Sequence, residues 1–549
     1  MVELIKDNAP PRSLYRDFRY LVRVNILERA RLFAIRVTRV WDQKLNSRGP
    51  KDTEGSKRGF LFNVQYCWAF SDLEFMSAAR LVTEKHAVAV IVCDGLPYCE
   101  REDINHRRPS CVSCTKQTLR NCSAYGLEPI LLSDHISVGV RENASLSAKG
   151  ELSSLVNYKD EGVPVGVIAK RNHEHFMKGD YEPAGAHEAL FRRCYEASYL
   201  LSRASAAIAE RYSDRDLITA NGKFCQTGIP AAWARKFGNS YFSYEVFGQG
   251  NGVIVDKNRP SVEQNLDAVW GDIRQTVLSD EERARLYRSF ELQNKSLSSA
   301  FQLWDGSRVD SESEIISALG LDVSKKIFAC YPNVAWDSTC MGISGVCDSI
   351  TSWLLAMIEF AKAHSDTQVV IRAHPAEVKV PDPLKSSVTI CDTLRYRVRD
   401  IPSNVIFVEA SNPISSYGLA SIADANLVWN GTIGLELCLR GIKPIVVADA
   451  YYSKKGFTID FLNLEEMFSA LLALDEKPVV LADEIKWVEL FAFHIRFYRK
   501  FNPPYYNGSR ASNFHFGNLH RGESIALDNM IDYFLDQRSY MNMGAFEFE

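Results

Sequence analysis

The segments V-V-I-R-A-H-P-A-E (369–377), I-S-S-Y-G-L (414–419), A-N-L-V-W-N-G-T-I-G-L-E (425–436) and G-I-K-P-I-V-V-A (441–448) follow one another within about ninety residues. Short apolar strands here end in polar turns, and each turn carries groups suited to a phosphate or a sugar. In an open parallel sheet, ligands bind where the carboxyl ends of the strands meet the following turns. The order of these motifs predicts an α/β domain with a nucleotide-sugar or nucleotide-phosphate site.

The composition narrows the class of protein. The chain has 549 residues, of which 46% are hydrophobic and 24% charged, as in ordinary globular proteins with more than one domain. The net charge of -4 argues against a nucleic-acid partner. No apolar run is long enough for a transmembrane helix, and the first residues lack a signal core. Thirteen cysteines, an odd number, favour reduced thiols, so we expect a cytoplasmic protein.

Apolar strands alternate with helical periods in both halves of the chain, which predicts parallel doubly wound sheets. We therefore expect an α/β fold with two Rossmann-like domains facing a cleft, an N-terminal helical extension and a C-terminal crossing helix. The expected divisions are a basic helix and linker at 1–57, an acceptor domain at 58–255 with an irregular Cys-rich loop at 97–125, a helical connector at 256–320, a donor domain at 321–483, and a segment at 484–549 that packs back on the first domain.

Individual elements follow from the periodicity of apolar residues. In the first half we predict strands at 59–66, 87–93, 129–133, 163–169, 217–220 and 240–246, with helices at 72–85 and 184–212. In the second half we predict strands at 326–330, 368–373, 404–408, 425–429 and 443–448, with helices at 349–364 and 484–502.

Residues 12–45 have the pattern of a basic amphipathic helix, with nine Lys or Arg residues against three acids. Such a helix can lie on an anionic membrane surface, so peripheral contact with the inner face of the cell membrane is one prediction. The alternative is that the helix packs on its own domain with its arginines in solvent.

The motif Arg372-Ala373-His374-Pro375-Ala376-Glu377 follows a predicted strand. An arginine fork matches phosphate oxygens, and a histidine can donate a proton or a hydrogen bond to a leaving phosphate. We predict His374 as a catalytic residue, with Arg372 and Glu377 in the donor site. The alternative is a strand-end histidine held by a carbonyl group.

The other turns of this half supply further donor-site candidates. Hydroxyls at a helix N-terminus can bind an anion, although Ser415 would also serve as an ordinary helix N-cap. Glycines allow close backbone approach, and Glu436 can bind paired hydroxyls or remain a solvated first-turn carboxylate. A tryptophan can stack on a ring or pack in a loop. The candidates are Ser415, Ser416, Asn430, Gly431, Thr432, Gly434, Glu436, Asn333, Trp336 and Asp337.

A base that deprotonates an acceptor hydroxyl must face the cleft from the first domain. Asp94, at the end of a predicted strand, and Glu245 are the catalytic candidates that we carry forward. Sequence alone does not rank the alternatives, which are Asp72, His106, His135, His173 and His175.

Four cysteines form a C-x11-C-x2-C-x7-C pattern. Thiolates with one C-x2-C pair can hold a structural zinc ion, whereas a strong zinc signal has two such pairs. Free thiols under a long loop are the alternative. The candidate ligands are Cys99, Cys111, Cys114 and Cys122.

Together these motifs resemble bacterial capsule and surface-polysaccharide glycosyltransferases of the two-Rossmann (GT-B) type, which include Kdo transferases. The resemblance is clearest over 327–460 and looser over 59–255. In Kdo transferases and sialyltransferases, a His-Pro histidine and paired serines contact the phosphate of a CMP-sugar. By that analogy His374, Ser415 and Ser416 hold the donor phosphate, and Asp94 is the base. This chain has a single acid there, where those enzymes have a pair.

The resemblance implies transfer of a sugar from a CMP-Kdo-like or a UDP-, GDP- or dTDP-sugar donor to a hydroxyl of a cell-surface glycan or glycolipid, such as capsule or lipopolysaccharide. We expect no required cofactor, because Arg372, His374 and helix N-termini can neutralise the leaving group and no D-x-D pair stands at a strand end. The alternatives are a nucleotide-sugar 2-epimerase and a non-catalytic envelope-assembly protein.

Overall fold

The computed structural model describes residues 58–64, 71–99, 111–179, 187–246, 252–294, 308–343, 345–501 and 520–537. The predicted basic helix at 12–45 and His106 lie outside the described residues, as does the side chain of Asp72. Within the described stretches, no helix is both long enough and apolar enough to span a bilayer.

The first domain is built on a sheet in the order β13-β6-β5-β4-β1-β2-β3. Strands β1 to β5 are parallel, whereas β6 is antiparallel to both β5 and β13. Because both faces of the sheet are covered, its strands are continuous apolar runs such as G-F-L-F-N-V. The strands are β1 (Gly59–Val64), β2 (Ala87–Val92), β3 (Glu128–Leu131), β4 (Arg215–Ala220), β5 (Tyr241–Val246), β6 (Val253–Lys257) and β13 (Lys500–Phe501).

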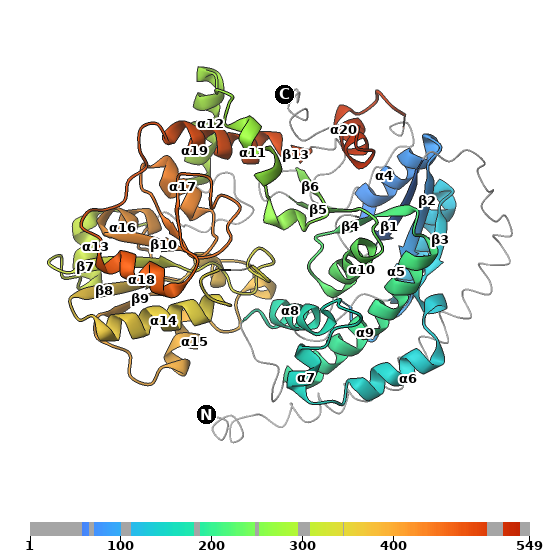
Figure 1. Cartoon of the computed structure of the whole chain (residues 1–549), viewed down its shortest axis with the longest axis horizontal. Coiled ribbons are helices and arrows are strands. Elements are labelled where there is room, and N and C mark those ends of the chain that lie inside the picture. The colour runs from blue at the N-terminus through green and yellow to red at the C-terminus, as the bar shows by residue number, and fades with distance from the viewer. Residues whose placement is uncertain are drawn as a thin grey trace.

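Two apolar clusters cover the two faces of this sheet (Figure 1). One face packs against α4 (Ser71–Thr83), α5 (Cys111–Tyr125) and α20 (Ile525–Phe534). The other packs against α8 (Val165–Met177), α9 (Glu188–Arg211) and α10 (Cys225–Lys236), with α6 (Val138–Ser147) and α7 (Leu152–Val156) at the margin.

The second domain has a parallel sheet in the order β12-β11-β10-β7-β8-β9. One face packs on α14 (Ile350–Ala363), α15 (Ile390–Arg397) and α18 (Leu464–Leu472), and the other on α13 (Glu312–Leu319), α16 (Ser416–Ile422) and α17 (Ile433–Leu439). The strands are β7 (Lys326–Tyr331), β8 (Thr367–Arg372), β9 (Val405–Val408), β10 (Ala425–Val428), β11 (Ile445–Val446) and β12 (Ile459–Asp460).

The strand order reverses between β4 and β1 in the first sheet, and between β10 and β7 in the second. These switch points are where open α/β sheets bind ligands. The carboxyl ends of the two sheets face each other, since Lys223, after β4, donates from Nζ to the carbonyl of Met341, after β7, at 3.0 Å. Two doubly wound domains that face each other across a cleft form the GT-B architecture, so the predicted fold class is confirmed.

The described chain passes between the domains twice. Residues after β6 lead to α11 (Asp267–Ile273) and α12 (Asp280–Asn294), which share a cluster with α17 and α19 (Ile485–Phe493). The chain returns through a π-helical turn (His494–Tyr498) to β13. Arg499 joins the two passages: its guanidinium pairs with Asp256 of β6 and donates from Nη1 to the carbonyl of Asn265 at 2.7 Å.

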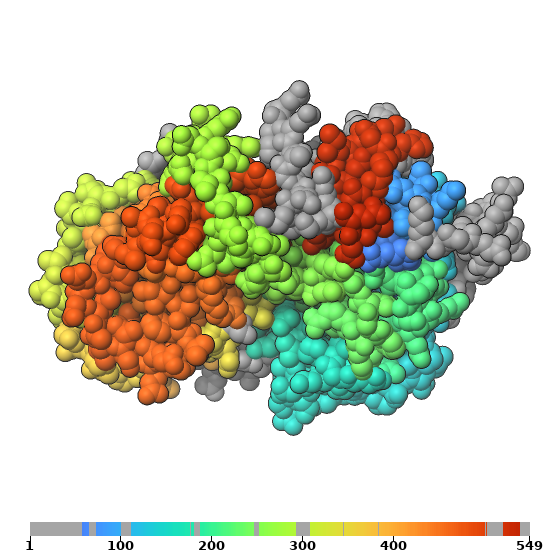
Figure 2. Space-filling model, turned by 45° about the horizontal axis from the view of Figure 1, so that its top comes forward, coloured from blue at the N-terminus to red at the C-terminus, as the bar shows by residue number. Residues whose placement is uncertain are grey.

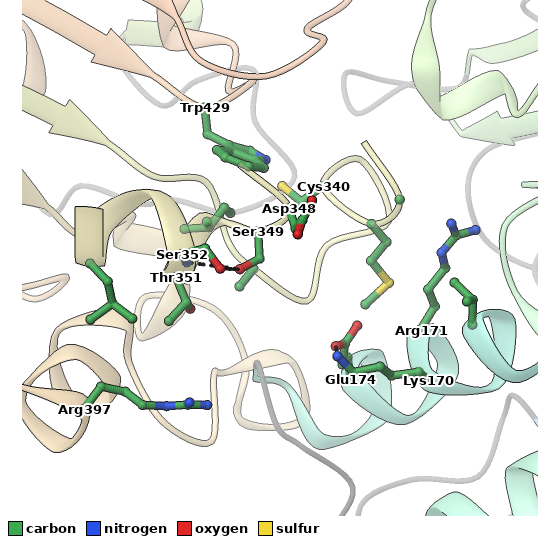
Figure 3. A pocket seen from close by; sticks show the side chains of 16 residues that line it. Lys170, Arg171, Glu174, Cys340, Asp348, Ser349, Thr351, Ser352, Arg397 and Trp429 are labelled. Carbon is green, nitrogen blue, oxygen red and sulfur yellow. Dashed lines mark hydrogen bonds and ion pairs between the residues drawn. The ribbon is translucent and has the colours of Figure 1, made fainter. Parts of the chain in front are cut away.

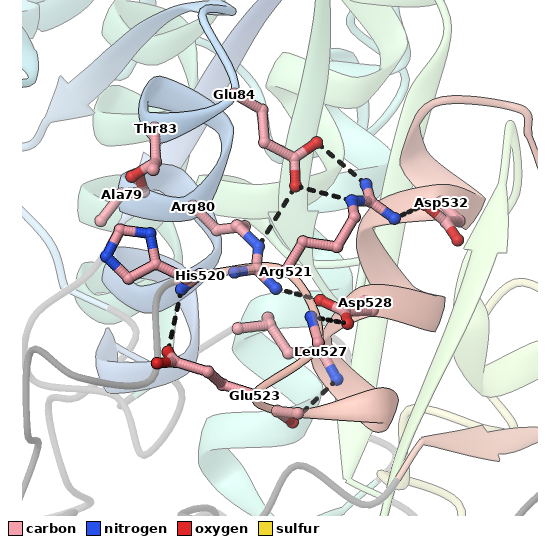
Figure 4. A network of polar contacts seen from close by, with 12 residues as sticks. Ala79, Arg80, Thr83, Glu84, His520, Arg521, Glu523, Leu527, Asp528 and Asp532 are labelled. Carbon is pink, nitrogen blue, oxygen red and sulfur yellow. Dashed lines mark hydrogen bonds and ion pairs between the residues drawn. The ribbon is translucent and has the colours of Figure 1, made fainter.

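Helix α20 lies against α4 on the surface of the first domain (Figure 2). Beneath it, Arg80 is fully buried and pairs with Asp528 of α20 and, at 3.2 Å, with Glu84. Glu84 also pairs with Arg521, which pairs in turn with Asp532 (Figure 4). The ion-pair network therefore fixes a C-terminal helix to an element from the start of the first domain.

Three local predictions differ from the structure. The predicted strand at 163–169 is the start of α8, because the short apolar run continues at helical spacing into buried Asn172 and His173. The predicted irregular loop at 97–125 contains helix α5 from Cys111 onward. The helix predicted at 484–502 ends at Phe493, and the chain then forms the π-helical turn and β13.

Candidate functional site

A pocket of about 430 Å³ lies between α8 of the first domain and the carboxyl edge of the second sheet. Figure 3 shows Lys170, Arg171 and Glu174 of α8 across the space from the first turn of α14, with Trp429 above and Arg397 below. This volume is in the range of small-molecule sites, which often lie at domain interfaces. The residues that line the pocket include Lys170, Arg171, Glu174, Asp348, Ser349, Thr351, Arg397 and Trp429.

The pocket opens beside the switch point of the second sheet. The loop after β7 and the end of β10 are held together there by Asn333, whose Nδ2 donates to Asn430 Oδ1 at 3.1 Å. Asn430 donates from Nδ2 to the carbonyl of Thr339 at 2.7 Å. The two asparagines thus position the loop that forms one pocket wall. Direct contact between either side chain and a donor stays a prediction.

His374 follows β8 and is partly exposed. Its Nδ1 accepts the N–H of Ala376 at 3.1 Å, so the neutral ring carries its proton on Nε2. Burial, together with the charge of Arg372, lowers the pKa of His374 to about 4. The ring is therefore neutral near pH 7, and its Nε2–H is available as a hydrogen-bond donor.

Arg372 is buried and its guanidinium holds the backbone of a neighbouring loop. Nη1 donates to the carbonyls of Ala373 at 2.9 Å and Glu409 at 2.8 Å, and Nη2 donates to that of Asn412 at 3.2 Å. In this conformation the side chain therefore fixes the loop that leads to α16. Contact between Arg372 and a donor phosphate stays a prediction.

Glu377 is buried and accepts the N–H of Ile390 on Oε1 at 3.0 Å, at the start of α15. Its Oε2 has no hydrogen-bond partner among the described residues. Burial is the largest cause that raises the pKa of Glu377, to about 8. The carboxyl group is therefore mostly protonated at neutral pH. In this conformation Glu377 holds the start of α15, and its contact with a donor stays a prediction.

The substitution Glu377→Gln tests this protonation state. The unfolded chain ionises Glu377 above its ordinary pKa of 4.5, whereas the folded chain keeps it protonated up to about pH 8, so wild-type stability falls as pH rises through that window. Glutamine keeps the acceptor without titrating. We expect the variant to gain roughly 3 kcal/mol relative to wild type between about pH 5 and about pH 8, measured by urea unfolding. A pH-independent difference would contradict the assignment.

Ser415 and Glu436 lie on the face of the sheet opposite α14. Ser415 is fully buried and caps α16, accepting the N–H groups of Tyr417 and Gly418 and the Nε–H of Arg308. The buried carboxylate of Glu436 accepts the hydroxyl of Tyr417. Both predicted ligands thus have protein partners, while Ser416, at the start of α16, is partly exposed.

The N-G-T-I-G motif has two glycines with different surroundings. A Cβ on Gly434 would lie 2.1 Å from the hydroxyl oxygen of Tyr452, so packing requires that glycine. A Cβ on Gly431, by contrast, would have its nearest neighbouring atoms at 3.8 Å or beyond. Thr432 is exposed. The open side of this turn is therefore at Gly431 and Thr432.

Trp336 is covered by the first domain. The ammonium of Lys178 lies 4.0 Å from the centre of its ring, and His175 contacts the ring edge and the Trp336 carbonyl. The indole N–H donates to Ser386 Oγ at 2.9 Å. Nearby, Asp337 accepts the N–H and hydroxyl of Thr339. In this conformation Trp336 joins the domains, and stacking on a ligand ring stays a prediction.

Replacing Trp336 with alanine should loosen this contact, because it removes the cation–π partner of Lys178 and the aromatic surface under His175. We expect about 1–2 kcal/mol to be lost from the closed arrangement. Amide hydrogen exchange in the last turn of α8 should then accelerate roughly tenfold. Tyr396→Ala, on an exposed side chain of the same domain, is the control. Unchanged exchange would show that Trp336 does not hold the domains together.

The base candidates of the first domain are not among the residues that line the pocket. Asp94 is buried and accepts the N–H of Ser133 at 2.9 Å, and burial raises its pKa. Glu245 on β5 accepts Asn221 Nδ2 at 2.8 Å, beside the end of β4. Each is tied to a turn at the carboxyl edge, and the role of base stays a prediction for both.

The alternative histidines differ in their surroundings. His173 packs on His187 and Phe191 in the core, away from the pocket. His175 faces Trp336, and burial lowers the pKa of both His173 and His175 to about 4. His135 is partly exposed in the turn after β3.

The cysteine cluster does not form a ligand set in the described structure. Cys122 is buried on α5, whereas Cys99, Cys111 and Cys114 are partly exposed. Within the described stretches there is no group of three or more side chains positioned to hold a metal ion. Residues 100–110, between Cys99 and α5, lie outside those stretches, so a structural zinc ion stays a prediction.

Among known proteins, the chain is similar to solved structures but to no family model and no curated protein. The beta Kdo 2,7 transferase KpsC of Thermosulfurimonas dismutans aligns at 13% identity over 61% of this chain and 90% of that chain, with a TM-score of 0.30. A putative UDP-N-acetylglucosamine 2-epimerase from Listeria monocytogenes aligns at 8% identity over 90% and 99%, with a TM-score of 0.24.

A third solved structure is the glycosyltransferase SnogD from Streptomyces nogalater, at 10% identity over 80% of this chain and 94% of that chain, with a TM-score of 0.18. These proteins are glycosyltransferases and nucleotide-sugar epimerases. Identities and scores this low assign no activity to the present chain.

The first-domain wall of the pocket was missed by the sequence analysis. Lys170, Arg171 and Glu174 fall just after the region predicted as a strand, and they share one face only because the segment is the helix α8. The usable signal was the helical spacing of Val165, Ile168 and Ala169, which continues beyond the apolar run.

Proposed function

We propose that the protein is a glycosyltransferase that moves a sugar from a nucleotide-sugar donor to a hydroxyl group of a glycan or glycolipid acceptor. The observation that carries the proposal is the pocket between the facing carboxyl edges of two doubly wound domains, beside the β7–β10 switch point. A ligand there is held by both domains, as transfer between two substrates requires.

The second domain is the proposed donor side. The turn at Gly431 and Thr432 gives open backbone at the switch point, and the Nε2–H of His374 is available to the leaving phosphate. A phosphate near the ring would favour its charged form and raise its pKa toward the ordinary value. His374 would thereby stabilise charge that develops on the leaving group.

The first domain is the proposed acceptor side, with Asp94 or Glu245 as the base. No metal ion is required in the proposed reaction, because the Nε2–H of His374 and the open backbone at Gly431 and Thr432 would stabilise the leaving phosphate. We further propose a CMP-Kdo-like or UDP-, GDP- or dTDP-sugar donor, a surface polysaccharide or lipopolysaccharide acceptor, and action in the cytoplasm at the inner membrane face through residues 12–45.

A thermal-shift panel of CMP, UDP, GDP and dTDP with their sugars tests the donor side. A nucleotide that binds only the folded protein raises the melting temperature by mass action. Products are then analysed with donor alone and with acceptor, in the presence and absence of a chelator. Transfer that needs acceptor and resists chelation supports the proposal. Epimerised donor without acceptor would replace it with the epimerase alternative, and no nucleotide binding would overturn both.

A further inference from the structure

The first turn of α14 opens directly onto the pocket. Ser349 caps this 14-residue helix by accepting the N–H of Ser352 at 3.1 Å. The N–H groups of Ile350 and Thr351 have no acceptor within the helix, because the first turn of any helix leaves them unused. They carry the positive end of the helix dipole toward the space in front of Ser349.

Two further donor groups are buried in the same wall without partners. Thr351 is 5% exposed and Trp429 is 1% exposed, and both line the pocket. The hydroxyl of Thr351 and the indole N–H of Trp429 have no hydrogen-bond partner among the described residues. Leaving such groups unpaired costs about 1–3 kcal/mol each. An indole N–H can only donate, so the atom that would satisfy it is an acceptor.

The charges around these donors are mainly positive. Lys170 lies across the space from α14, the guanidinium of Arg171 lies against the loop at Gly342, and Arg397 reaches in from α15 (Figure 3). Of the two carboxylates in the lining, Glu174 pairs with Lys170 at 3.4 Å, and Asp348 lies just before the helix cap. Three cationic side chains against two carboxylates leave a positive balance beside the helix N-terminus.

We propose that this pocket binds a carboxylate or phosphate oxyanion carried by a sugar substrate, at the N-terminus of α14. Thr351 and Trp429 donate hydrogen bonds to it, and Arg397 balances its charge. The site is separate from the leaving phosphate, since His374, Ser416 and Thr432 are not among the residues that line the pocket. The identity of the ligand as a sugar substrate rests on the proposed function, whereas the binding of an oxyanion does not.

The test uses the full-length protein and three probes, glucuronate, glucose 6-phosphate and glucose, titrated in a thermal-shift assay. We expect an anionic probe to raise the melting temperature while glucose does not. Response to glucuronate alone identifies a carboxylate substrate, and response to glucose 6-phosphate alone a phosphorylated one; either supports the proposal. Thr351→Val and Trp429→Phe should each weaken the response about tenfold, since a hydrogen bond to a charged group is lost.

Trp353→Phe is the matched control. Trp353 packs on Trp429 with ring centres 5.9 Å apart and also has a buried indole N–H without a partner among the described residues, but it does not line the pocket. This control should bind the anionic probes as wild type does. Equal binding of glucose, or unchanged binding in both Thr351→Val and Trp429→Phe, would overturn the proposal. Failure of the proposed function would instead appear as absent nucleotide binding, with probe binding intact.

Discussion

Replacing His374 with alanine is expected to lower sugar transfer by about 10²–10³-fold, the usual effect of removing one donor that stabilises developing charge. The reason is the protonation state of the ring. Nδ1 is occupied by the N–H of Ala376, so the proton sits on Nε2, where it can bind a phosphate oxygen. Turnover is measured with the donor that the thermal-shift panel identifies, and nucleotide affinity by calorimetry.

The matched control is His364→Ala. His364 is another partly exposed histidine of the same domain, but it precedes β8 and therefore lies at the opposite edge of the sheet from His374. Its removal should leave transfer within a factor of about two. Near-normal turnover in His374→Ala, with the fold intact, would show that His374 takes no part in the reaction.

Replacing Asp528 with alanine should cost about 3 kcal/mol of stability in the first domain, because it removes one of the carboxylates that pair with the fully buried guanidinium of Arg80. Asp528 also accepts the N–H of Gly522 at 2.7 Å, which would lose its partner. Glu84 remains beside Arg80 at 3.2 Å, which keeps the expected cost near the lower end for a broken buried pair. Calorimetry should show an earlier first transition, and limited proteolysis should release the C-terminal segment.

Two further variants test whether charge burial is the cause. Asp532→Ala removes a carboxylate from the same helix, but its partner Arg521 is well exposed, so at most about 1 kcal/mol should be lost. The double variant Arg80→Met with Asp528→Leu removes both charges and should recover most of the stability. A double variant as unstable as Asp528→Ala would point to packing of α20 instead.

The fold was largely predictable from sequence because its strands are buried on both faces. Continuous apolar runs such as Val369–Ile371 and Leu427–Val428 are typical of core strands in a covered parallel sheet, and the intervening helical periods supply the cover. The strand predicted at the start of α8 was wrong because an apolar run of this length can also belong to a buried helix. V-P-V-G-V-I-A is equally apolar, and only the contacts of the following residues with the cluster around α9 decide that it is a helix.

The candidate site was less predictable because its motifs serve two purposes. The sequence places Arg372, Ser415, Glu377 and Glu436 at turns near the carboxyl edge, and the structure shows each with protein partners. Which polar side chains keep a free donor depends on contacts between residues distant in sequence. Thr351 and Trp429 belong to different motifs, and no local pattern brings them to one pocket wall.

The double passage of the chain between the domains constrains how the pocket can open. Arg499 ties both passages together beside β6, on the upper side of the molecule in Figure 1, whereas α8 lies below. Two attachments close to each other leave rotation about one axis as the easy relative motion and suppress sliding. Displacement grows with distance from that axis, so the contact of Lys178 with Trp336 should part first, and a small angular change would suffice to admit a substrate.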